Sequence, residues 1–387
     1  MALPNAVVSK QALPWHVLVS CGISLICPVK RILFFAFLLI SLTARPQYRI
    51  IAYTTSGDSV VARYPVHKLT HIIFSFLRIK NDTLCFANEN QRKALMGIVA
   101  LKKQNPGLKV MVSIGGWGGC YSCSELFSTD ARRKTFARTT VELFREYHID
   151  GLDLDWEYPA IEGYPGHPYK PEDRDNFSEL IRSLRAEMGD RFLLSFAAGG
   201  FIDYLERSVD WKTVMPLVDM VNIMSYDLVG GYSTVTGHHT PLYSGKDSAQ
   251  SADRAISWLL NKNIPSGKLI MGSAFYGRVW REVPDTAHGL YQSGKFTRGV
   301  AFKEFNHYFS DSSGFNYYWD KKAKAAWRYD PAKKLFATFD DQRSLAEKVK
   351  YIKNRHLGGI MFWELAQDKE KEGLIELIYE KLKQAHQ

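Results

Sequence analysis

Short apolar runs alternate with amphipathic stretches along the chain from residue 47 onward. Runs such as Ile72-Ile73-Phe74 and Val110-Met111-Val112 are nearly continuous in apolar residues, which is typical of strands buried on both faces of a sheet. The pattern predicts strands at residues 48–53, 71–76, 109–113, 149–155, 192–197, 220–225, 269–275 and 359–363. Apolar residues at helical spacing between them predict helices near residues 127–147, 173–189, 250–262, 342–356 and 369–385.

Eight strands that alternate with helices predict an α/β protein built as a closed (β/α)8 TIM barrel. An open doubly wound sheet is the alternative, but no Gly-x-Gly-x-x-Gly turn follows the first strand. The interval 279–356 is too long for an ordinary connection and contains short aromatic-rich segments. We therefore expect one domain over residues 46–387, with a small α+β insertion at 279–341 between the seventh and eighth strands.

The first 45 residues have the features of a leader. Lys30 and Arg31 precede an apolar run of about ten residues, which is followed by small residues and Pro46, as in a signal peptide. The run is short for a membrane span, which needs roughly 20 apolar residues. A weaker apolar stretch within 1–29 leaves open an over-extended gene start or an uncleaved anchor. We expect export to the periplasm, the cell surface or the medium, with no stable membrane span after processing.

The formal net charge is +10. Four basic residues and no acidic ones precede residue 46, so residues 46–387 have a net charge of about +6. Their basic residues are spread along the sequence and form no cluster. A nucleic-acid binder usually concentrates its basic residues, so we expect no nucleic-acid partner and a monomeric protein. Aromatic residues make up 13% of the chain. Core packing accounts for most of them, and binding to flat sugar faces is a common use for a surplus.

Three cysteines lie beyond the leader: Cys85, Cys120 and Cys123. Cys120 and Cys123 stand in a Gly-rich loop, and no second pair completes a zinc site. Export makes disulfides possible. Two alternatives stay open, a local disulfide that tightens this loop and a pair of free thiols.

The strand at 149–155 and the residues after it carry an unusual set of acids. Asp153, Asp155 and Glu157 alternate with Leu and Trp, so the three carboxyl groups share one face of an extended segment. With the apolar residues facing the helices, the carboxyls point into the barrel. Like charges in a buried site raise at least one pKa, which leaves a carboxyl able to protonate a leaving group near neutral pH. A Ca²⁺ loop would need a central Gly, whereas a Mg²⁺ or Mn²⁺ site is a minor alternative.

Together with four other segments, this strand resembles glycoside hydrolase family 18, the chitinase family. The resemblance extends from about residue 47 to the end, in order and in strand placement. It is carried by Asp150-Gly-Leu-Asp153-Leu-Asp155-Trp-Glu157, Ser113-Ile-Gly-Gly-Trp117, Met224-Ser-Tyr226-Asp227, Phe275-Tyr276-Gly277-Arg278 and Gly358-Gly-Ile-Met-Phe-Trp363. The interval 279–356 resembles the insertion domain of the deep-groove branch of the family.

The resemblance implies a retaining, substrate-assisted hydrolysis of β-1,4-linked N-acetylglucosamine chains such as chitin and its oligosaccharides. Glu157 would act as general acid and then as general base, while the 2-acetamido oxygen of the substrate attacks the anomeric carbon. Asp155 would hold the acetamido N–H, and Asp153 would take up a shared proton with Tyr53 and Ser113 as its hydrogen-bond partners.

The resemblance further implies that Tyr226 bonds the acetamido carbonyl, that Asp227 supports the sugar and the acid, and that Trp363 forms an apolar floor. Trp117, Met224, Tyr276 and Arg278 are expected substrate contacts, with packing or loop support as the alternative. Gly115 and Gly116 would allow close backbone approach, or would form a plain tight turn. Four more aromatic residues would line the groove wall or fill the core of the insertion: Trp280, Tyr317, Tyr318 and Trp319.

The family implies no metal and no organic cofactor. His238 and His239 have no acidic partner at metal spacing, and we interpret them as loop residues. Two other functions stay open: an endo-β-N-acetylglucosaminidase acting on N-glycan cores or peptidoglycan, and a non-catalytic chitin-binding lectin. Lectins on this scaffold typically lack the acid at the position of Glu157, which is present here.

Overall fold

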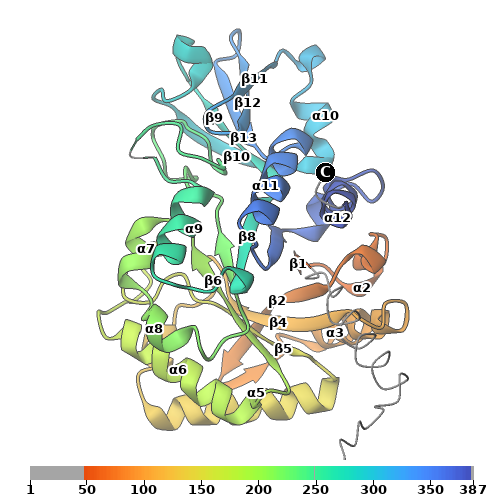
Figure 1. The fold of residues 1–387 in the computed structure, drawn as a ribbon, viewed down its shortest axis with the longest axis vertical. Helices are drawn as coiled ribbons and strands as arrows, with labels where there is room; N and C mark the ends of the chain where they lie inside the picture. The colour runs from red at the N-terminus through yellow and green to blue at the C-terminus, as the bar shows by residue number, and fades with distance from the viewer. Residues whose placement is uncertain (1–47, 248, 385–387) are drawn as a thin grey trace, which may run out of the picture. The chain divides into compact units, whose positions relative to one another are not determined.

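Eight parallel strands close into a barrel in the computed structural model, which describes residues 48–247 and 249–384 (Figure 1). The strand β1 pairs with both β2 and β14, so the sheet has no free barrel edge. The barrel strands are β1 (Arg49–Thr54), β2 (His71–Lys80), β4 (Lys109–Gly115), β5 (Gly151–Asp155), β6 (Leu193–Gly199), β7 (Met220–Met224), β8 (Leu269–Ala274) and β14 (Gly359–Trp363). The predicted TIM barrel is confirmed. The predicted leader, residues 1–45, lies outside the described residues.

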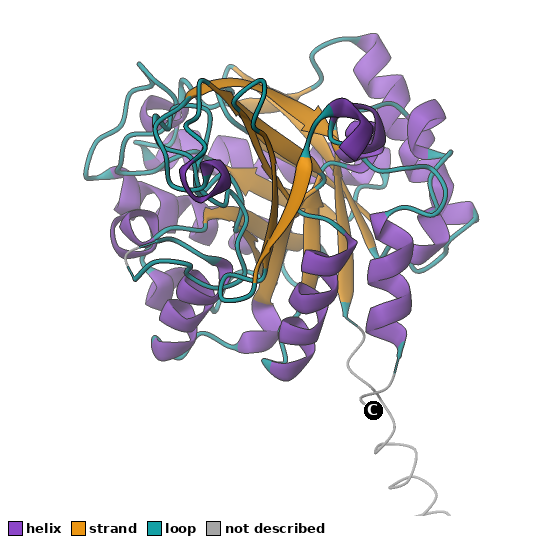
Figure 2. Cartoon of the chain, turned by 90° about the horizontal axis from the view of Figure 1, so that it is seen from above, coloured by secondary structure: helices purple, strands orange, loops and turns teal. Residues whose placement is uncertain are grey.

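Helices surround the barrel, as Figure 2 shows with strands in the centre and helices around them. They are α2 (Asp58–Val61), α3 (Glu89–Ala100), α4 (Cys123–Leu126), α5 (Asp130–Tyr147), α6 (Asp173–Met188), α7 (Ile202–Arg207), α8 (Trp211–Val214), α9 (Ala252–Asn261), α11 (Gln342–Asn354) and α12 (Leu374–Lys383). The helices α2, α3, α4, α7 and α8 were not among the predicted ones. Within the described part of the chain, no helix is long and apolar enough to cross a membrane.

Side chains alternate between the inside and the outside of the barrel. On β1, Ile51 and Tyr53 belong to the inner apolar cluster, whereas Ile50 packs in the cluster between the sheet and the helices. On β5, Leu152 and Leu154 also pack outward against the helices. Because side chains alternate along a strand, the two acids of β5 point into the barrel, as the sequence pattern predicts.

The insertion is a five-stranded antiparallel sheet between β8 and β14, and it stands above the barrel in Figure 1. Its strands are β9 (Tyr276–Arg281), β10 (Lys295–Ala301), β11 (Asn316–Asp320), β12 (Ala325–Asp330) and β13 (Leu335–Phe339), in the order β10-β9-β13-β12-β11. A short helix, α10 (Phe305–Tyr308), follows β10. The sheet begins at Tyr276, three residues before the predicted start, because Phe275 alone separates β8 from β9. Trp280 is fully buried and belongs to the insertion's own core.

A buried ion pair joins the insertion to the barrel. Lys348 of α11 contacts Asp340, which follows β13, at 2.6 Å, and both side chains are fully buried. The same carboxylate oxygen accepts hydrogen bonds from Ser273 of β8 (3.0 Å) and from Thr240 (3.2 Å). These donors compensate part of the cost of burying the charges. The end of the insertion is therefore fixed to the barrel and to the loop that follows β7.

Candidate active site

A pocket of about 520 Å³ opens at the carboxyl ends of the barrel strands, beside the insertion. Its volume lies within the range usual for small-molecule sites. Nine residues that the sequence analysis selected line it together: Trp117, Asp155, Glu157, Met224, Tyr226, Asp227, Tyr276, Arg278 and Trp363. The barrel and the inserted sheet both contribute, because Tyr276 and Arg278 belong to β9.

Asp153 lies inside the barrel and is fully buried. One of its carboxylate oxygens accepts hydrogen bonds from Ser195 (2.6 Å) and Asn222 (3.0 Å), and the other accepts from Tyr53 and Ser113 (2.9 Å each). Burial raises the pKa of Asp153, and these four donors oppose the rise because they stabilise the ionised form. Three of the donors are hydroxyls, which can rotate to accept a hydrogen bond instead. The surroundings of Asp153 therefore suit either protonation state.

Asp155 is buried in the wall of the pocket and is 4% exposed. Its Oδ1 atom has no hydrogen-bond partner among the described residues. Burial and the charges of Glu157 and Asp153 raise its pKa well above the ordinary value. A buried carboxylate oxygen without a partner is costly, so this atom is available for a donor on a bound molecule.

Glu157 follows β5 and keeps part of its surface open to the pocket. Burial raises its pKa to about 7, a hydrogen bond with Tyr158 opposes this rise, and the negative charge of Asp227 adds to it. A carboxyl group with this pKa is about half protonated at neutral pH, which leaves the acid form available to a proton donor. Over the described residues, no group of three or more His, Cys, Asp or Glu side chains is arranged to hold a metal ion.

Asp227 is held by the inserted sheet. Arg278 donates to both carboxylate oxygens, at 2.7 and 2.5 Å, and the Tyr276 hydroxyl donates at 2.9 Å. Burial raises the pKa of Asp227, but His239 and Arg278 together lower it below the ordinary value, so Asp227 remains an anion. Its φ of 54° lies in the left-handed region, a conformation that costs energy for a residue other than Gly. Its neighbour Tyr226 lies in the same pocket, with its hydroxyl 3.8 Å from the sulfur of Met361.

His239 is a site residue that the sequence analysis did not identify. Its ring is fully buried, and Nδ1 lies 3.5 Å from a carboxylate oxygen of Asp227, a distance too long for a normal hydrogen bond. The ring also packs against Tyr276, with centroids 5.4 Å apart. Burial lowers the pKa of His239, so the ring is neutral at neutral pH. His238 instead contacts Asp320 of the inserted sheet at 3.1 Å. The interpretation of this pair as simple loop residues was therefore incomplete.

Gly115 and Gly116 have positive φ angles of 99° and 78°. A Cβ on Gly116 would lie 2.4 Å from the ring of Phe76, so close packing as well as turn geometry requires Gly there. Phe76 stacks on Trp363 with centroids 5.7 Å apart, and Tyr53 contacts the same indole at 5.9 Å. Trp363 is thus fixed by two aromatic neighbours while it lines the pocket.

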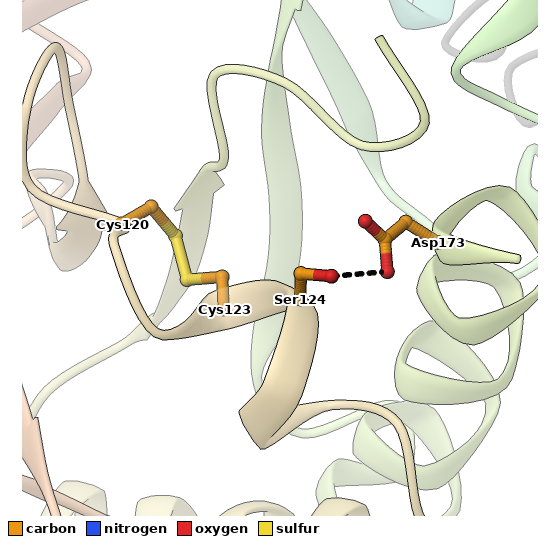
Figure 3. The surroundings of a disulfide bond; sticks show 4 residues. All are labelled: Cys120, Cys123, Ser124 and Asp173. Atoms are coloured by element: carbon orange, nitrogen blue, oxygen red, sulfur yellow. Dashed lines mark hydrogen bonds between the residues drawn. A yellow bond between two sulfur atoms is a disulfide. The ribbon is translucent and has the colours of Figure 1, made fainter. Parts of the chain in front are cut away.

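A disulfide joins Cys120 to Cys123 between β4 and α4, as Figure 3 shows. Both cysteines are buried, at 5% and 2% exposure. The next residue, Ser124, donates a 2.9 Å hydrogen bond to Asp173 at the start of α6 (Figure 3). The loop after β4 is therefore linked to the loop after β5.

Other pocket residues were also not predicted. Phe76, Tyr158, Phe201 and Tyr232 line the pocket with the predicted set. Phe76 is the last residue of the predicted second strand, so the rule that active residues lie at the carboxyl ends of barrel strands could have found it. No comparable signal marks Tyr232, which the long loop after β7 brings to the pocket.

Comparison with known proteins identifies the family. The model of Glycosyl hydrolases family 18 matches residues 49–368. The chain belongs to this family. The resemblance deduced from the sequence motifs is confirmed.

Relatives within family 18 include enzymes and a protein named without an activity. The chain is 33% identical over 295 residues to Chitinase A1 of Niallia circulans, covering 70% of this chain and 42% of the relative. It is 28% identical over 417 residues to Chitinase B of Serratia marcescens, covering 85% and 81%. It is also 32% identical over 319 residues to the human oviduct-specific glycoprotein, covering 77% and 46%. The chain thus spans less than half the length of two of these relatives.

Solved structures of family 18 members have the same fold. Chitinase ChiW from a Paenibacillus strain superposes with a TM-score of 0.80 at 31% identity, covering 87% of this chain and 43% of that one. A family 18 N-acetylglucosaminidase from Paenibacillus barengoltzii gives 0.76 at 32% identity, covering 87% and 100%.

Proposed function

We propose that this chain is a retaining, substrate-assisted chitinase that hydrolyses β-1,4-linked N-acetylglucosamine chains. One observation carries the proposal: a carboxyl group with a pKa of about 7, Glu157, lines the same pocket as Asp155, whose Oδ1 atom has no partner. The first group suits proton donation to a glycosidic oxygen. The second suits an N–H donor such as that of an acetamido group.

In the first step, Glu157 transfers its proton to the oxygen between two sugar units, and the bond from that oxygen to the anomeric carbon breaks. The acetamido oxygen of the same sugar forms a new bond to the anomeric carbon, which gives a cyclic oxazolinium ion. Asp155 accepts the acetamido N–H and offsets the positive charge. The Asp153 carboxylate is enclosed by its four donors and does not line the pocket. In the proposed mechanism the acetamido group takes the place of a carboxylate nucleophile.

In the second step, Glu157 accepts a proton from a water molecule, and the water oxygen attacks the anomeric carbon from the face that the leaving group occupied. The carbon–oxygen bond to the acetamido group breaks, so the product retains its β configuration. The Trp363 indole offers an apolar surface under the sugar, and Tyr226 offers a hydroxyl to the acetamido carbonyl. Burial raises the pKa of Glu157, and the anionic Asp227 adds to this rise.

The relatives support a glycosidase whose substrate contains N-acetylglucosamine, since they include proteins named as chitinases and one named as an N-acetylglucosaminidase. A lectin on this scaffold is disfavoured, because Asp153, Asp155 and Glu157 are all present.

The test is hydrolysis of the N-acetylglucosamine hexamer, with products followed by NMR and mass spectrometry. We expect the β-anomer first, and a 10²–10⁴-fold lower rate for Glu157→Gln, the range for a positioned proton donor. A matched thermal unfolding profile for the variant would show that its fold is intact. Hydrolysis of the hexamer by Glu157→Gln at the wild-type rate would contradict the proposal. Cleavage of N-glycan cores or peptidoglycan, with the hexamer left intact, would favour the alternative substrates.

Export is a further part of the proposal. The segment at residues 30–44, which has the form of a signal peptide, supports it, and so does the Cys120–Cys123 disulfide, since disulfides persist in oxidising compartments. We expect the mature protein to begin near residue 46, which N-terminal sequencing of the native protein measures. Recovery of the whole chain from the cytosol would contradict export.

A further inference from the structure

We propose that His239 is a positioning residue for the reaction, whose Nδ1–H donates a hydrogen bond to Asp227 and fixes that carboxylate at the pocket. The inference rests on the proposed function, because Asp227 acts there beside Glu157. His239 does not line the pocket itself, so it would influence the sugar only through Asp227.

The segment His239-Thr240 binds the backbone on both sides of Asp227. The Thr240 hydroxyl donates to the Ser225 carbonyl at 3.0 Å, and the His239 carbonyl accepts from the Leu228 N–H at 3.0 Å. Ser225 and Leu228 flank the two pocket residues of this loop. The left-handed backbone conformation of Asp227, with its φ of 54°, is therefore supported from both directions along the chain.

The inserted sheet in turn fixes His239. Its backbone N–H donates to the Thr338 hydroxyl of β13 at 3.2 Å, and Thr338 is the register partner of Arg278 on β9. Arg278 and Tyr276 of β9 both donate to the Asp227 carboxylate, and the His239 ring packs against Tyr276. The ring is therefore placed beside Asp227 by the same strands that supply the other donors.

Both ring nitrogens of His239 are buried, and neither has a hydrogen-bond partner among the described residues. Burial lowers the pKa of His239, Asp227 and Asp340 oppose this effect, and Arg278 adds to it. The ring is therefore neutral at neutral pH and carries one proton. A buried N–H without an acceptor is costly, and a carboxylate oxygen of Asp227 lies 3.5 Å from Nδ1. This arrangement favours the proton on Nδ1.

The Asp227 oxygen nearest His239 is Oδ1, which also accepts from Nε of Arg278 at 2.7 Å. Hydrogen bonds in active sites often tighten as the transition state forms. A movement of about 0.5 Å would bring Nδ1 within the normal range for an N–H···O bond. A second N–H on Oδ1 would keep Asp227 ionised and oriented beside Glu157 during the reaction.

The test replaces His239 by a residue that keeps the donor and by one that does not. The side-chain amide of Asn can place an N–H near the position of Nδ1, whereas Leu fills a similar volume without a donor. On an aryl glycoside of the N-acetylglucosamine dimer, we expect His239→Asn to keep kcat within about threefold of the wild type. We expect His239→Leu to lose about tenfold in kcat, with KM within about twofold. A role in packing alone predicts the opposite order, since Leu suits a buried position better than Asn.

A second measurement, on the wild-type protein, reports the ring directly. Nitrogen-15 NMR distinguishes the two neutral tautomers of a histidine from each other and from the charged form. We expect His239 to be neutral with its proton on Nδ1 between about pH 6 and 8, with its signals identified by their loss in His239→Asn. A proton on Nε2, or a charged ring in this range, would overturn the inference.

The matched control is His238→Leu, which removes the neighbouring ring of the same loop. His238 contacts Asp320 instead of Asp227, so we expect kcat within about threefold of the wild type. An equal loss of kcat in this control would overturn the inference, because the effect would then come from the loop as a whole. The thermal unfolding profile of each variant checks its fold.

The outcomes separate the inference from the proposed function. Turnover by the wild type together with an unchanged kcat for His239→Leu would overturn the role of His239 and leave the proposed function intact. If the wild type hydrolyses no glycoside of N-acetylglucosamine, the proposed function fails, and the role of His239 in the reaction fails with it.

Discussion

Gly115 at the end of β4 packs directly against the carbonyl oxygen of Asp155, and a Cβ at this position would lie 2.1 Å from that oxygen. The next residue, Gly116, donates its N–H to the same oxygen at 2.8 Å. The backbone that carries Asp155 is therefore positioned by a neighbouring strand whose last residue must lack a side chain.

The Gly115→Ala substitution should both destabilise the protein and impair catalysis. The new methyl group would displace β5 near Asp155, and Gly115 has a φ of 99°, which strains any other residue. We expect a loss of about 1–3 kcal/mol in the free energy of unfolding, measured by urea titration, and a kcat at least tenfold lower. The control is Gly267→Ala, where a Cβ meets open space and φ is not positive. A variant with wild-type kcat would contradict the positioning role.

The Asp155→Asn substitution should slow the reaction far more than it weakens binding. In the proposed mechanism it removes the charge that offsets the oxazolinium ion, while a side chain of the same shape remains in the pocket. We expect kcat on the dimer aryl glycoside to fall on the order of 10²-fold, with KM within about threefold of the wild type. An increase in KM alone, at unchanged kcat, would assign Asp155 to binding and not to the reaction.

The pH dependence of kcat/KM should reveal the ionisation of Glu157. In the proposed mechanism its acid form is the reactive one, and its pKa is about 7. As the pH rises through 7, the acid form is lost, so kcat/KM should fall and approach a tenfold decrease per pH unit. The Asp227→Asn variant should shift this decline to lower pH, because the charge of Asp227 raises the pKa of Glu157. A shift to higher pH in that variant would contradict the assignment.

The Arg278→Ala substitution tests how the insertion supports the barrel. Asp227 would lose two charge-assisted hydrogen bonds but keep the bond from Tyr276. The Asp227 side chain is 34% exposed, so water would replace part of the lost interaction. We expect kcat/KM to fall about tenfold, equivalent to ~1.4 kcal/mol. The Arg281→Ala variant, which removes an exposed Arg of the same strand, is the control. An equal effect of the two substitutions would contradict a specific role for Arg278.

The barrel and its acidic strand could be predicted because their signals are local. Continuous apolar runs mark buried parallel strands, and the spacing of Asp153, Asp155 and Glu157 places them together without knowledge of any other element. Helix α3 was missed since only Leu95 and Ile98 of its twelve residues are buried, which leaves a weak apolar stripe.

The contacts between distant segments could not be predicted in the same way. His239 lies beside Asp227 because the long loop after β7 folds back on itself. The sequence of this loop has no hydrophobic periodicity from which its course could be predicted. The rings of Trp117 and Tyr164 likewise meet only in the folded chain, since they stand in two separate loops. The need for Gly at position 116 can be recognised only when the structure shows that the ring of Phe76 packs against it.

The single residue between β8 and β9 has a mechanical consequence. Phe275 is fully buried and stacks on Phe362 with ring centroids 4.1 Å apart. The chain is therefore fixed at the point where it passes from the barrel to the inserted sheet. The Asp340–Lys348 ion pair fixes the chain where it returns from the inserted sheet to the barrel. With both crossings fixed, the inserted sheet is held against the barrel at two points, and the wall that Tyr276 and Arg278 contribute to the pocket is anchored to the barrel strands.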